Sequence, residues 1–275
     1  MTLSAEFLAR ALEAAHAAAD AAERVIHARY RERNFSVVAK ADATPVTEAD
    51  REAETAIKDV LRASFPTHAF LGEEHGREGA SDYLWLIDPI DGTKAFVRGY
   101  PMFSTQIALM HNGELVLGVS AAGEYGERAW ATSGGGAFVG RNVSEGNAVR
   151  VSAETRFGPM AAVSTGNLKS MAAHATRWEA LGSLVKRVGR IRGYGDFLHY
   201  HLLSRGSIDL VIESDLNILD IAALAVIVRE AGGVFTTLDG GPIGLDSTDA
   251  LAGTAALHAE ALALFNPLAV SPTSL

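Results

Sequence analysis

Hydrophobic positions recur at helical spacing in the first 64 residues and then fall into short runs typical of β-strands. We predict a long helix over residues 3–30 and a second helix over residues 47–64, in which Thr47 is the N-cap and Asp50 completes a capping box. The short apolar runs predict strands at residues 69–71, 83–88, 105–110, 114–120 and 128–132. Asn-Gly at residues 112–113 favours a hairpin between two of these strands. This part of the chain is therefore expected to form a meander with helices on one side.

After about residue 150 the pattern changes to an alternation of strands and helices. Strands are predicted at residues 161–165, 208–213 and 234–237, and helices at residues 174–187, 196–204 and 218–231. The Gly-Gly pair at residues 232–233 ends the last of these helices. We therefore expect an N-terminal α+β part over residues 1–150 and a C-terminal α/β part over residues 151–275, which together form a single compact unit.

Composition and charge exclude several classes of function. No apolar run reaches the about 18 residues that a membrane span needs, and the first helix carries Glu6, Arg10 and Asp20, so we expect neither a membrane partner nor a signal peptide. The chain has no cysteine, which excludes disulfides, thiolate metal sites and a cysteine nucleophile, and favours a cytoplasmic protein. The net charge of −9 and the lack of a basic stripe argue against nucleic acid as a partner.

Acidic residues stand where three apolar segments begin or end. Asp88 and Asp91 follow a run of four apolar residues, Glu73 follows a short strand, and Asp220 lies in the first turn of a helix. Each feature alone is ordinary, because such residues are also found in turns, on solvated loops and at helix N-caps. If the segments converge, however, carboxylates without Cys or His select a hard cation, Mg²⁺ or Mn²⁺ rather than Zn²⁺. Two ions that share Asp88 would form a two-metal site.

The residues around the two aspartates suit an anion beside such cations. Pro89 is rigid and bends the chain, so that Asp88, the Ile90 carbonyl and Asp91 could reach one side. If a helix begins at Gly92-Thr93, its free N–H groups would bind a phosphate. The Thr93 hydroxyl could then hydrogen-bond an attacking water.

Four segments of the chain resemble the inositol monophosphatase family of metal-dependent sugar-phosphate phosphatases. They are "VTEAD" (46–50), "GEE" (72–74), "DPIDGT" (88–93) and "DIAALAVIVREAGG" (220–233), in the order in which the family has them. The resemblance implies a layered α/β/α/β/α sandwich, a homodimer and a small phosphorylated metabolite as substrate.

The resemblance also implies roles for particular residues. The implied ligands of two or three Mg²⁺ ions are Glu73, Asp88, the Ile90 carbonyl, Asp91 and Asp220. Thr93, with Glu73, would position the attacking water, and Gly92 and Thr93 would hold the phosphate. Lys40, Thr47 and Asp50 match residues that surround a more weakly bound third ion.

Other motifs are similar to the histidinol-phosphate phosphatase branch of the family. They are "DGTKAFVRGYP" (91–101), "GGGAF" (134–138) and "GYGDF" (193–197). Histidinol phosphate carries an ammonium group, with which Asp196 or Glu213 could pair. The alternatives are that Asp196 is only a helix N-cap and that Glu213 is a solvated strand end. The preferred interpretation is a Mg²⁺-dependent phosphomonoesterase that converts L-histidinol phosphate to L-histidinol in histidine biosynthesis.

Two departures keep other activities open. Lys94 also follows "DGT" in phosphatases that act on 3′-phosphoadenosine 5′-phosphate, and Leu219 replaces the tryptophan that usually precedes the family's last aspartate. The alternatives of the same class are inositol-1-monophosphatase, fructose-1,6-bisphosphatase and 3′-phosphoadenosine 5′-phosphate phosphatase. An alternative of another class is a non-catalytic binding protein of the same fold.

Overall fold

A computed structural model describes residues 3–32, 37–39 and 45–266. The chain forms two compact units. The first comprises residues 1–148 together with 219–227, and the second comprises residues 149–218 together with 228–275. Among the helices that the structure describes, none combines the length and the apolar character that crossing a bilayer requires.

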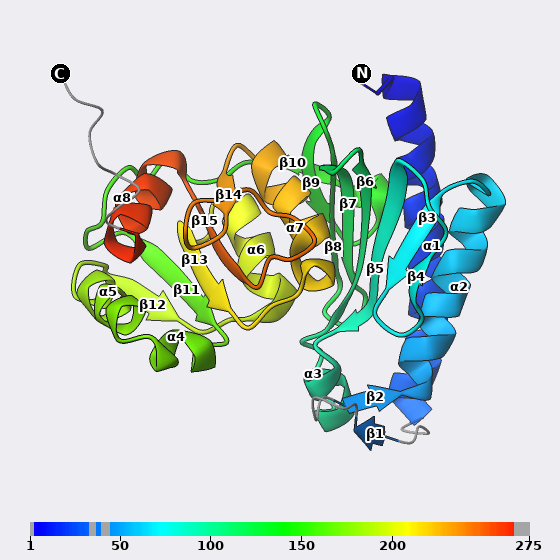
Figure 1. Cartoon of the computed structure of the whole chain (residues 1–275), viewed down its shortest axis with the longest axis horizontal. Coiled ribbons are helices and arrows are strands. Elements are labelled where there is room, and N and C mark those ends of the chain that lie inside the picture. The colour runs from blue at the N-terminus through cyan, green and yellow to red at the C-terminus, as the bar shows by residue number, and fades with distance from the viewer. Residues whose placement is uncertain (1–2, 33–36, 40–44, 267–275) are drawn as a thin grey trace. The chain divides into compact units, whose positions relative to one another are not determined.

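The first unit is built on an eight-stranded sheet with the order β10-β9-β8-β7-β6-β5-β3-β4 (Figure 1). The strands are β3 (Ala69–Gly72), β4 (Gly76–Glu78), β5 (Tyr83–Asp91), β6 (Ser104–His111), β7 (Glu114–Ala122), β8 (Glu127–Thr132), β9 (Gly136–Gly140) and β10 (Asn147–Val149), with a 3₁₀ turn η1 (Val143–Glu145) between the last two. Strand β3 is parallel to β5, whereas each successive pair from β5 to β9 is antiparallel.

Two helices, α1 (Ala5–Glu32) and α2 (Glu48–Ser64), lie side by side on one face of this sheet (Figure 1). Their buried residues form a core with strands β5 to β8, and burial of this apolar area is the main force that holds the layers together. The small strands β1 (Val37–Ala39) and β2 (Pro45–Thr47) pair with each other just before α2. Both predicted helices are confirmed within two residues at each end.

Local sequence signals are confirmed at two places in this unit. Thr47 caps α2 and Asp50 completes the capping box, as the sequence predicted. Asn112 and Gly113 both have positive φ angles, 50° and 83°, and form the tight turn of the predicted hairpin between β6 and β7. Such angles suit Asn and Gly and match the twist of the flanking strands.

The other face of the sheet contacts α7 (Ile218–Glu230), whose residues 219–227 belong to the first unit. Trp130 of β8 lies against His16 of α1, and its paired residue on the adjacent strand β7 is Val119. Val119 therefore faces α1 as well. Because side chains alternate along a strand, Gly118 faces away from α1. A Cβ at Gly118 would lie 2.3 Å from the carbonyl oxygen of Ala223 in α7, so this glycine permits the close approach of helix and strand.

Gly118→Ala is expected to destabilise the protein by about 1–3 kcal/mol, because the added methyl overlaps the backbone of α7 and something must shift. Urea unfolding measures this change. Gly182→Ala is the matched control, since a Cβ there meets nothing within 4 Å beyond the adjoining backbone of its own helix, and alanine favours a helix by about 0.5–1 kcal/mol. Equal stability of Gly118→Ala and the wild type would show that the close contact is not required.

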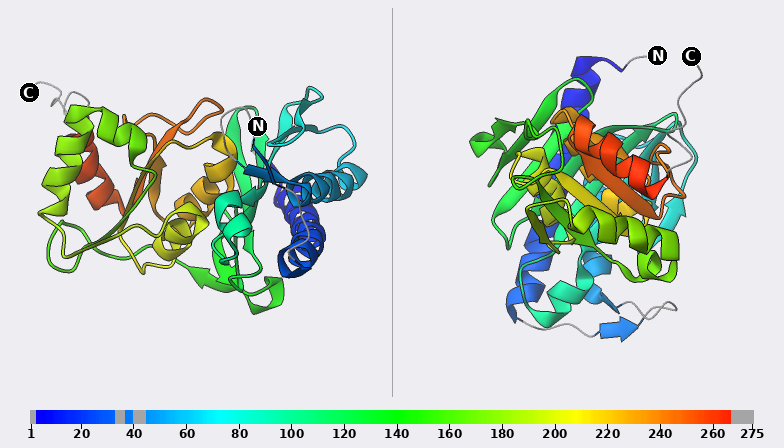
Figure 2. Two further views of the ribbon diagram at one scale, coloured as in Figure 1. Left: turned by 90° about the horizontal axis from the view of Figure 1, so that it is seen from below. Right: turned by 90° about the vertical axis from the view of Figure 1, so that its left-hand side faces the viewer.

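The second unit has a five-stranded sheet with the order β12-β11-β13-β15-β14. Its strands are β11 (Ala162–Gly166), β12 (Arg190–Arg192), β13 (Leu210–Ser214), β14 (Val234–Thr236) and β15 (Asp249–Gly253), and its helices are α4 (Lys169–Ala173), α5 (Ala175–Val185), α6 (Asp196–Ser204) and α8 (Ala255–Phe265). Helices α5 and α8 pack side by side (Figure 2) and share a core with β11, β13 and β15. The predicted alternation of strands and helices is confirmed, but α4, β15 and α8 were not predicted. Residues 249–265, which form β15 and α8, are apolar almost throughout and show no clear period.

Candidate metal centre

A β-bulge in β5 brings Asp88 and Asp91 to the same face of the sheet. Asp88 pairs with Gln106 and Asp91 with Ser104, so three steps along β5 match two steps along β6. In a regular strand residues three apart point to opposite faces, and the extra residue corrects this. Strand β5 therefore runs through Pro89 to Asp91 rather than ending at Asp88 as predicted.

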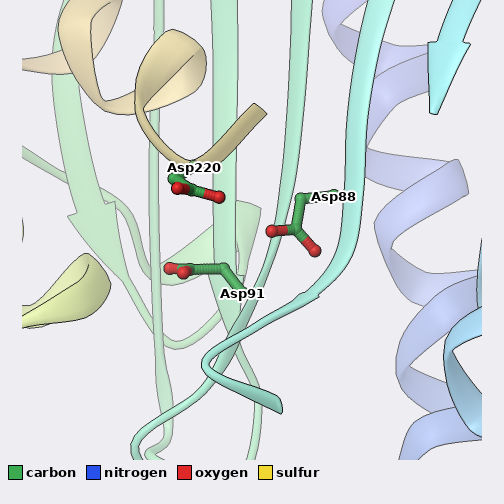
Figure 3. A group of neighbouring side chains, drawn as sticks. All are labelled: Asp88, Asp91 and Asp220. Carbon is green, nitrogen blue, oxygen red and sulfur yellow. The ribbon is translucent and has the colours of Figure 1, made fainter. Parts of the chain in front are cut away.

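The third carboxylate comes from α7. Carboxylate oxygens of Asp88, Asp91 and Asp220 all lie within 4.8 Å of one another, and the three side chains point toward a common space (Figure 3). Asp88 and Asp91 are buried, and Asp220 is half-buried. All three residues belong to the first unit, although more than 125 residues separate Asp220 from the other two. The predicted convergence of these three residues is therefore observed.

This cluster is electrostatically suited to a cation. Burial raises the pKa of Asp88 well above its usual value, and the charges of Glu73, Asp91 and Asp220 raise it further. A bound divalent ion would lower the pKa of Asp88 again, because its charge offsets the repulsion between the carboxylates and its coordination replaces the water that they lost on burial. The donor set is made of carboxylates alone, which fits a hard cation.

Glu73 lies beside the cluster, directly after β3. Its backbone N–H donates to the carbonyl of Ile87 at 3.2 Å, one residue before Asp88 on the neighbouring parallel strand. A side-chain hydrogen bond between Glu73 and Asp88 contributes to the raised pKa of Asp88. The structure therefore brings Glu73 to Asp88, in addition to the group of three aspartates.

Thr93 and Asp50 meet next to the bulge. The Thr93 hydroxyl donates to the Ile90 carbonyl at 3.0 Å and lies 3.4 Å from Asp50 Oδ1. Asp50 Oδ2 accepts hydrogen bonds from the backbone N–H and the hydroxyl of Thr47, both at 2.7 Å. Burial raises the pKa of Asp50 to about 6, against the lowering effect of the Thr47 hydrogen bonds. Thr47 thus orients Asp50 toward Thr93.

Gly92 makes the turn between the bulge and the short helix α3 (Thr93–Arg98). Its φ angle is 88°, and a Cβ there would lie 2.6 Å from the carbonyl oxygen of Met102, so glycine is required for both reasons. The helix that was conditionally expected after Asp91 is present. Lys40, the remaining predicted residue of this region, lies outside the described residues.

The two residues predicted to contact substrate, Asp196 and Glu213, belong to the second unit. Asp196 is half-buried and is the first residue of α6, after Gly195 at the N-cap. Glu213 is buried in β13, and one of its oxygens accepts from His199 Nε2 and the Tyr200 hydroxyl, both at 2.9 Å. Its burial excludes the alternative of a solvated strand end.

Glu54 lies next to the site, and the sequence analysis did not single it out. It is fully buried in α2, and its carboxylate accepts the backbone N–H of Glu74 at 2.7 Å, next to Glu73. A signal was available, because Glu54 follows Asp50 by four residues and precedes Lys58 by four, and such residues lie on one helix face.

Comparison with known proteins identifies the family. The chain matches the inositol monophosphatase family over residues 8–268 and belongs to that family. It is 41% identical to a histidinol-phosphatase of Streptomyces coelicolor, with 93% of this chain and 96% of that protein covered, and 38% identical to a histidinol-phosphatase of Mycobacterium tuberculosis, with 91% and 95% covered. The extragenic suppressor protein suhB from Bartonella henselae has a similar structure, with a TM-score of 0.81 and 30% identity over 95% of this chain and 98% of that one.

These findings confirm the family, the fold class and the kind of reaction predicted from the sequence. The protein is a phosphoric monoester hydrolase with the α/β sandwich fold of the inositol monophosphatases. Its cluster of three aspartates could bind a metal ion.

Proposed function

We propose that this protein is a Mg²⁺-dependent phosphomonoesterase that hydrolyses L-histidinol phosphate to L-histidinol and phosphate, a step of histidine biosynthesis. The observation that carries the proposal is the convergence of Asp88, Asp91 and Asp220 within 4.8 Å in a family of phosphatases. Mg²⁺ is proposed because the cluster offers oxygen alone, and Mn²⁺ could substitute.

The metal ligands are proposed to be the three aspartates, Glu73 and the Ile90 carbonyl. Bound Mg²⁺ would stabilise charge on the phosphate and lower the pKa of the attacking water. The Thr93 hydroxyl would accept a hydrogen bond from that water, and its own proton can turn from the Ile90 carbonyl to Asp50 Oδ1, which lies 3.4 Å away. The phosphate is placed against Gly92 and Thr93.

The substrate is proposed from two supports. The chain is 41% and 38% identical to two histidinol-phosphatases, and each alignment covers almost the whole length of that protein. In addition, Asp196 and Glu213 are carboxylates on the second unit that could pair with the ammonium of histidinol. Because Glu213 is buried whereas Asp196 is half-buried, we assign the ammonium contact first to Asp196.

A comparison of four substrates tests the proposal. Purified protein in Mg²⁺ is expected to show its highest kcat/KM with L-histidinol phosphate, ahead of myo-inositol monophosphate, fructose 1,6-bisphosphate and 3′-phosphoadenosine 5′-phosphate. EDTA should stop phosphate release, and added Mg²⁺ should restore it. A higher kcat/KM with any other member of the set would reassign the substrate, and no release from any of them would favour the non-catalytic binding protein.

Asp196→Ala is expected to lower kcat/KM for L-histidinol phosphate by roughly 10- to 100-fold, the value of a hydrogen bond to a charged group. It should leave kcat/KM for myo-inositol monophosphate nearly unchanged, because that substrate has no ammonium group. Asp246→Ala is the control, since Asp246 is an exposed aspartate of the same unit. Unchanged turnover of histidinol phosphate by Asp196→Ala would remove this residue from the specificity argument.

We also propose a homodimer in the cytoplasm with two or three ions in each site, as the family resemblance implies. Light scattering coupled to size-exclusion chromatography measures the mass against the 29.0 kDa of one chain. Calorimetric titration with Mg²⁺ gives the number of ions.

A further inference from the structure

A buried carboxylate outside the aspartate cluster supports the turn that carries Glu73. We propose that Glu54 is a positioning residue, which holds the residue 73–75 turn in place and so sets the metal affinity of the centre. The inference rests on the proposed function in one respect, that Glu73 is a metal ligand. Glu54 itself contacts the turn through the residues that follow Glu73.

Four donors surround the Glu54 carboxylate. Its Oε2 accepts the backbone N–H of Glu74 at 2.7 Å, and its Oε1 accepts the backbone N–H of His75 at 3.2 Å, His75 Nδ1 at 2.9 Å and Lys58 Nζ at 2.6 Å. Two backbone N–H groups and an ammonium can only donate, so both oxygens must accept. In a glutamine one of the two oxygens becomes an NH₂ group, which would then face a donor in whichever of the two positions it took. A carboxylate is therefore the group that satisfies this arrangement.

Gly72 leaves the space that the Glu54 carboxylate occupies. A Cβ at Gly72, the residue before Glu73, would lie only 2.0 Å from Glu54 Oε1. Gly72 does not have a positive φ angle, so the backbone itself would accept alanine at this position. What requires glycine is the space that the Glu54 carboxylate occupies, and this ties the end of β3 to Glu54.

Lys58 keeps the carboxylate fixed from the other side. Its side chain is 4% exposed and pairs with Glu54 and, at 2.7 Å, with Glu78 of β4. Asp50, Glu54 and Lys58 follow one another at intervals of four on α2, and thus lie on one helix face. Asp50 contacts Thr93, whereas Glu54 contacts the turn after Glu73. One face of α2 therefore supports two separate parts of the metal centre.

The test compares Glu54→Gln with the wild type by Mn²⁺ binding, measured by electron paramagnetic resonance on metal-free protein. Loss of groups that orient metal ligands costs about 10- to 100-fold in affinity, so we expect a Kd about tenfold or more above that of the wild type. At saturating Mg²⁺, kcat and the substrate KM should stay close to the wild-type values, since the centre is intact once filled. Glu52→Gln is the matched control, because Glu52 lies on the same helix in an exposed pair with Arg29.

Gly72→Ala provides a second test that does not alter the carboxylate. It should weaken Mn²⁺ binding as Glu54→Gln does, because the methyl displaces Glu54. In Glu54→Ala the carboxylate is gone, so a methyl group at residue 72 no longer overlaps it. The double variant Glu54→Ala/Gly72→Ala should therefore bind Mn²⁺ no more weakly than Glu54→Ala alone. Near-ultraviolet circular dichroism of each metal-free variant checks folding, and Gly72→Ala replaces Glu54→Gln in the comparison if the latter does not fold.

Failure of the inference and failure of the proposed function give different results. If the wild type binds Mn²⁺ and releases phosphate, but Glu54→Gln and Gly72→Ala bind Mn²⁺ as tightly as Glu52→Gln, the inference is wrong and the function stands. If the wild type binds no Mn²⁺, the proposed function is wrong, and the support given by Glu54 has no role in metal binding.

Discussion

Asp91→Asn is expected to reduce phosphate release below detection while the protein remains folded. The amide removes a negative charge and replaces one carboxylate oxygen with an NH₂ donor in a group whose members lie within 4.8 Å, so the group would bind a divalent cation far less tightly. Phosphate release from L-histidinol phosphate in Mg²⁺ measures the loss, and Mn²⁺ binding should weaken in parallel.

Stability separates this effect from misfolding. In metal-free protein Asp91→Asn removes repulsion from the cluster around Asp88, so its melting temperature should equal or exceed that of the wild type. Asp82→Asn is the control, since Asp82 is an exposed aspartate just before β5. Near-normal turnover by Asp91→Asn would contradict the proposed centre.

Metal-free protein is expected to lose stability as the pH rises above 3.8, the ordinary pKa of an aspartate. The pKa of Asp88 is about 3.8 in the unfolded chain and well above this in the folded protein, first because of burial and then because of neighbouring carboxylates. Between these two pKa values the folded state binds more protons than the unfolded state. The free energy of unfolding therefore falls with rising pH, by about 1.4 kcal/mol per unit for one proton.

Urea unfolding in EDTA at several pH values measures this slope. Asp88→Asn should flatten it, because the titrating group is gone, and the difference between the two proteins isolates Asp88 from other groups. Mg²⁺ should stabilise the wild type more at pH 8 than at pH 5, since protons compete with the cation for the carboxylates. A metal-free stability that rises with pH relative to Asp88→Asn would contradict the raised pKa that burial gives Asp88.

Local signals in the sequence predicted the two long N-terminal helices and the central strands of both sheets. The capping box at Thr47 and Asp50, the Asn-Gly turn at residues 112–113 and the helical spacing of α1 each depend on residues close together in the chain. Such signals work because capping and turn formation are short-range interactions. Residues 249–265 lack any such period, and β15 and α8 follow from their packing with β13 and α5.

The sequence alone gave the candidate ligands but left their arrangement open. Two aspartates three residues apart on a strand would face opposite ways, and the bulge that aligns Asp88 with Asp91 is seen only in the register between β5 and β6. Glu54 was missed although its spacing from Asp50 and Lys58 was visible, because spacing does not show that a glutamate is buried or that four donors surround its carboxylate.

The sequence by itself determined the residue types that this chemistry needs, namely carboxylates at the ends of apolar segments, a glycine before Thr93 and no cysteine, together with the family to which the motifs point. Tertiary structure alone decided that Asp220 reaches Asp88, that Glu73 lies beside them and that α2 supports both Thr93 and the turn after Glu73. The physical reason is range. Caps, turns and hydrophobic periods act between near neighbours in the chain, whereas the repulsion of buried charges depends on distances that only the packed structure sets.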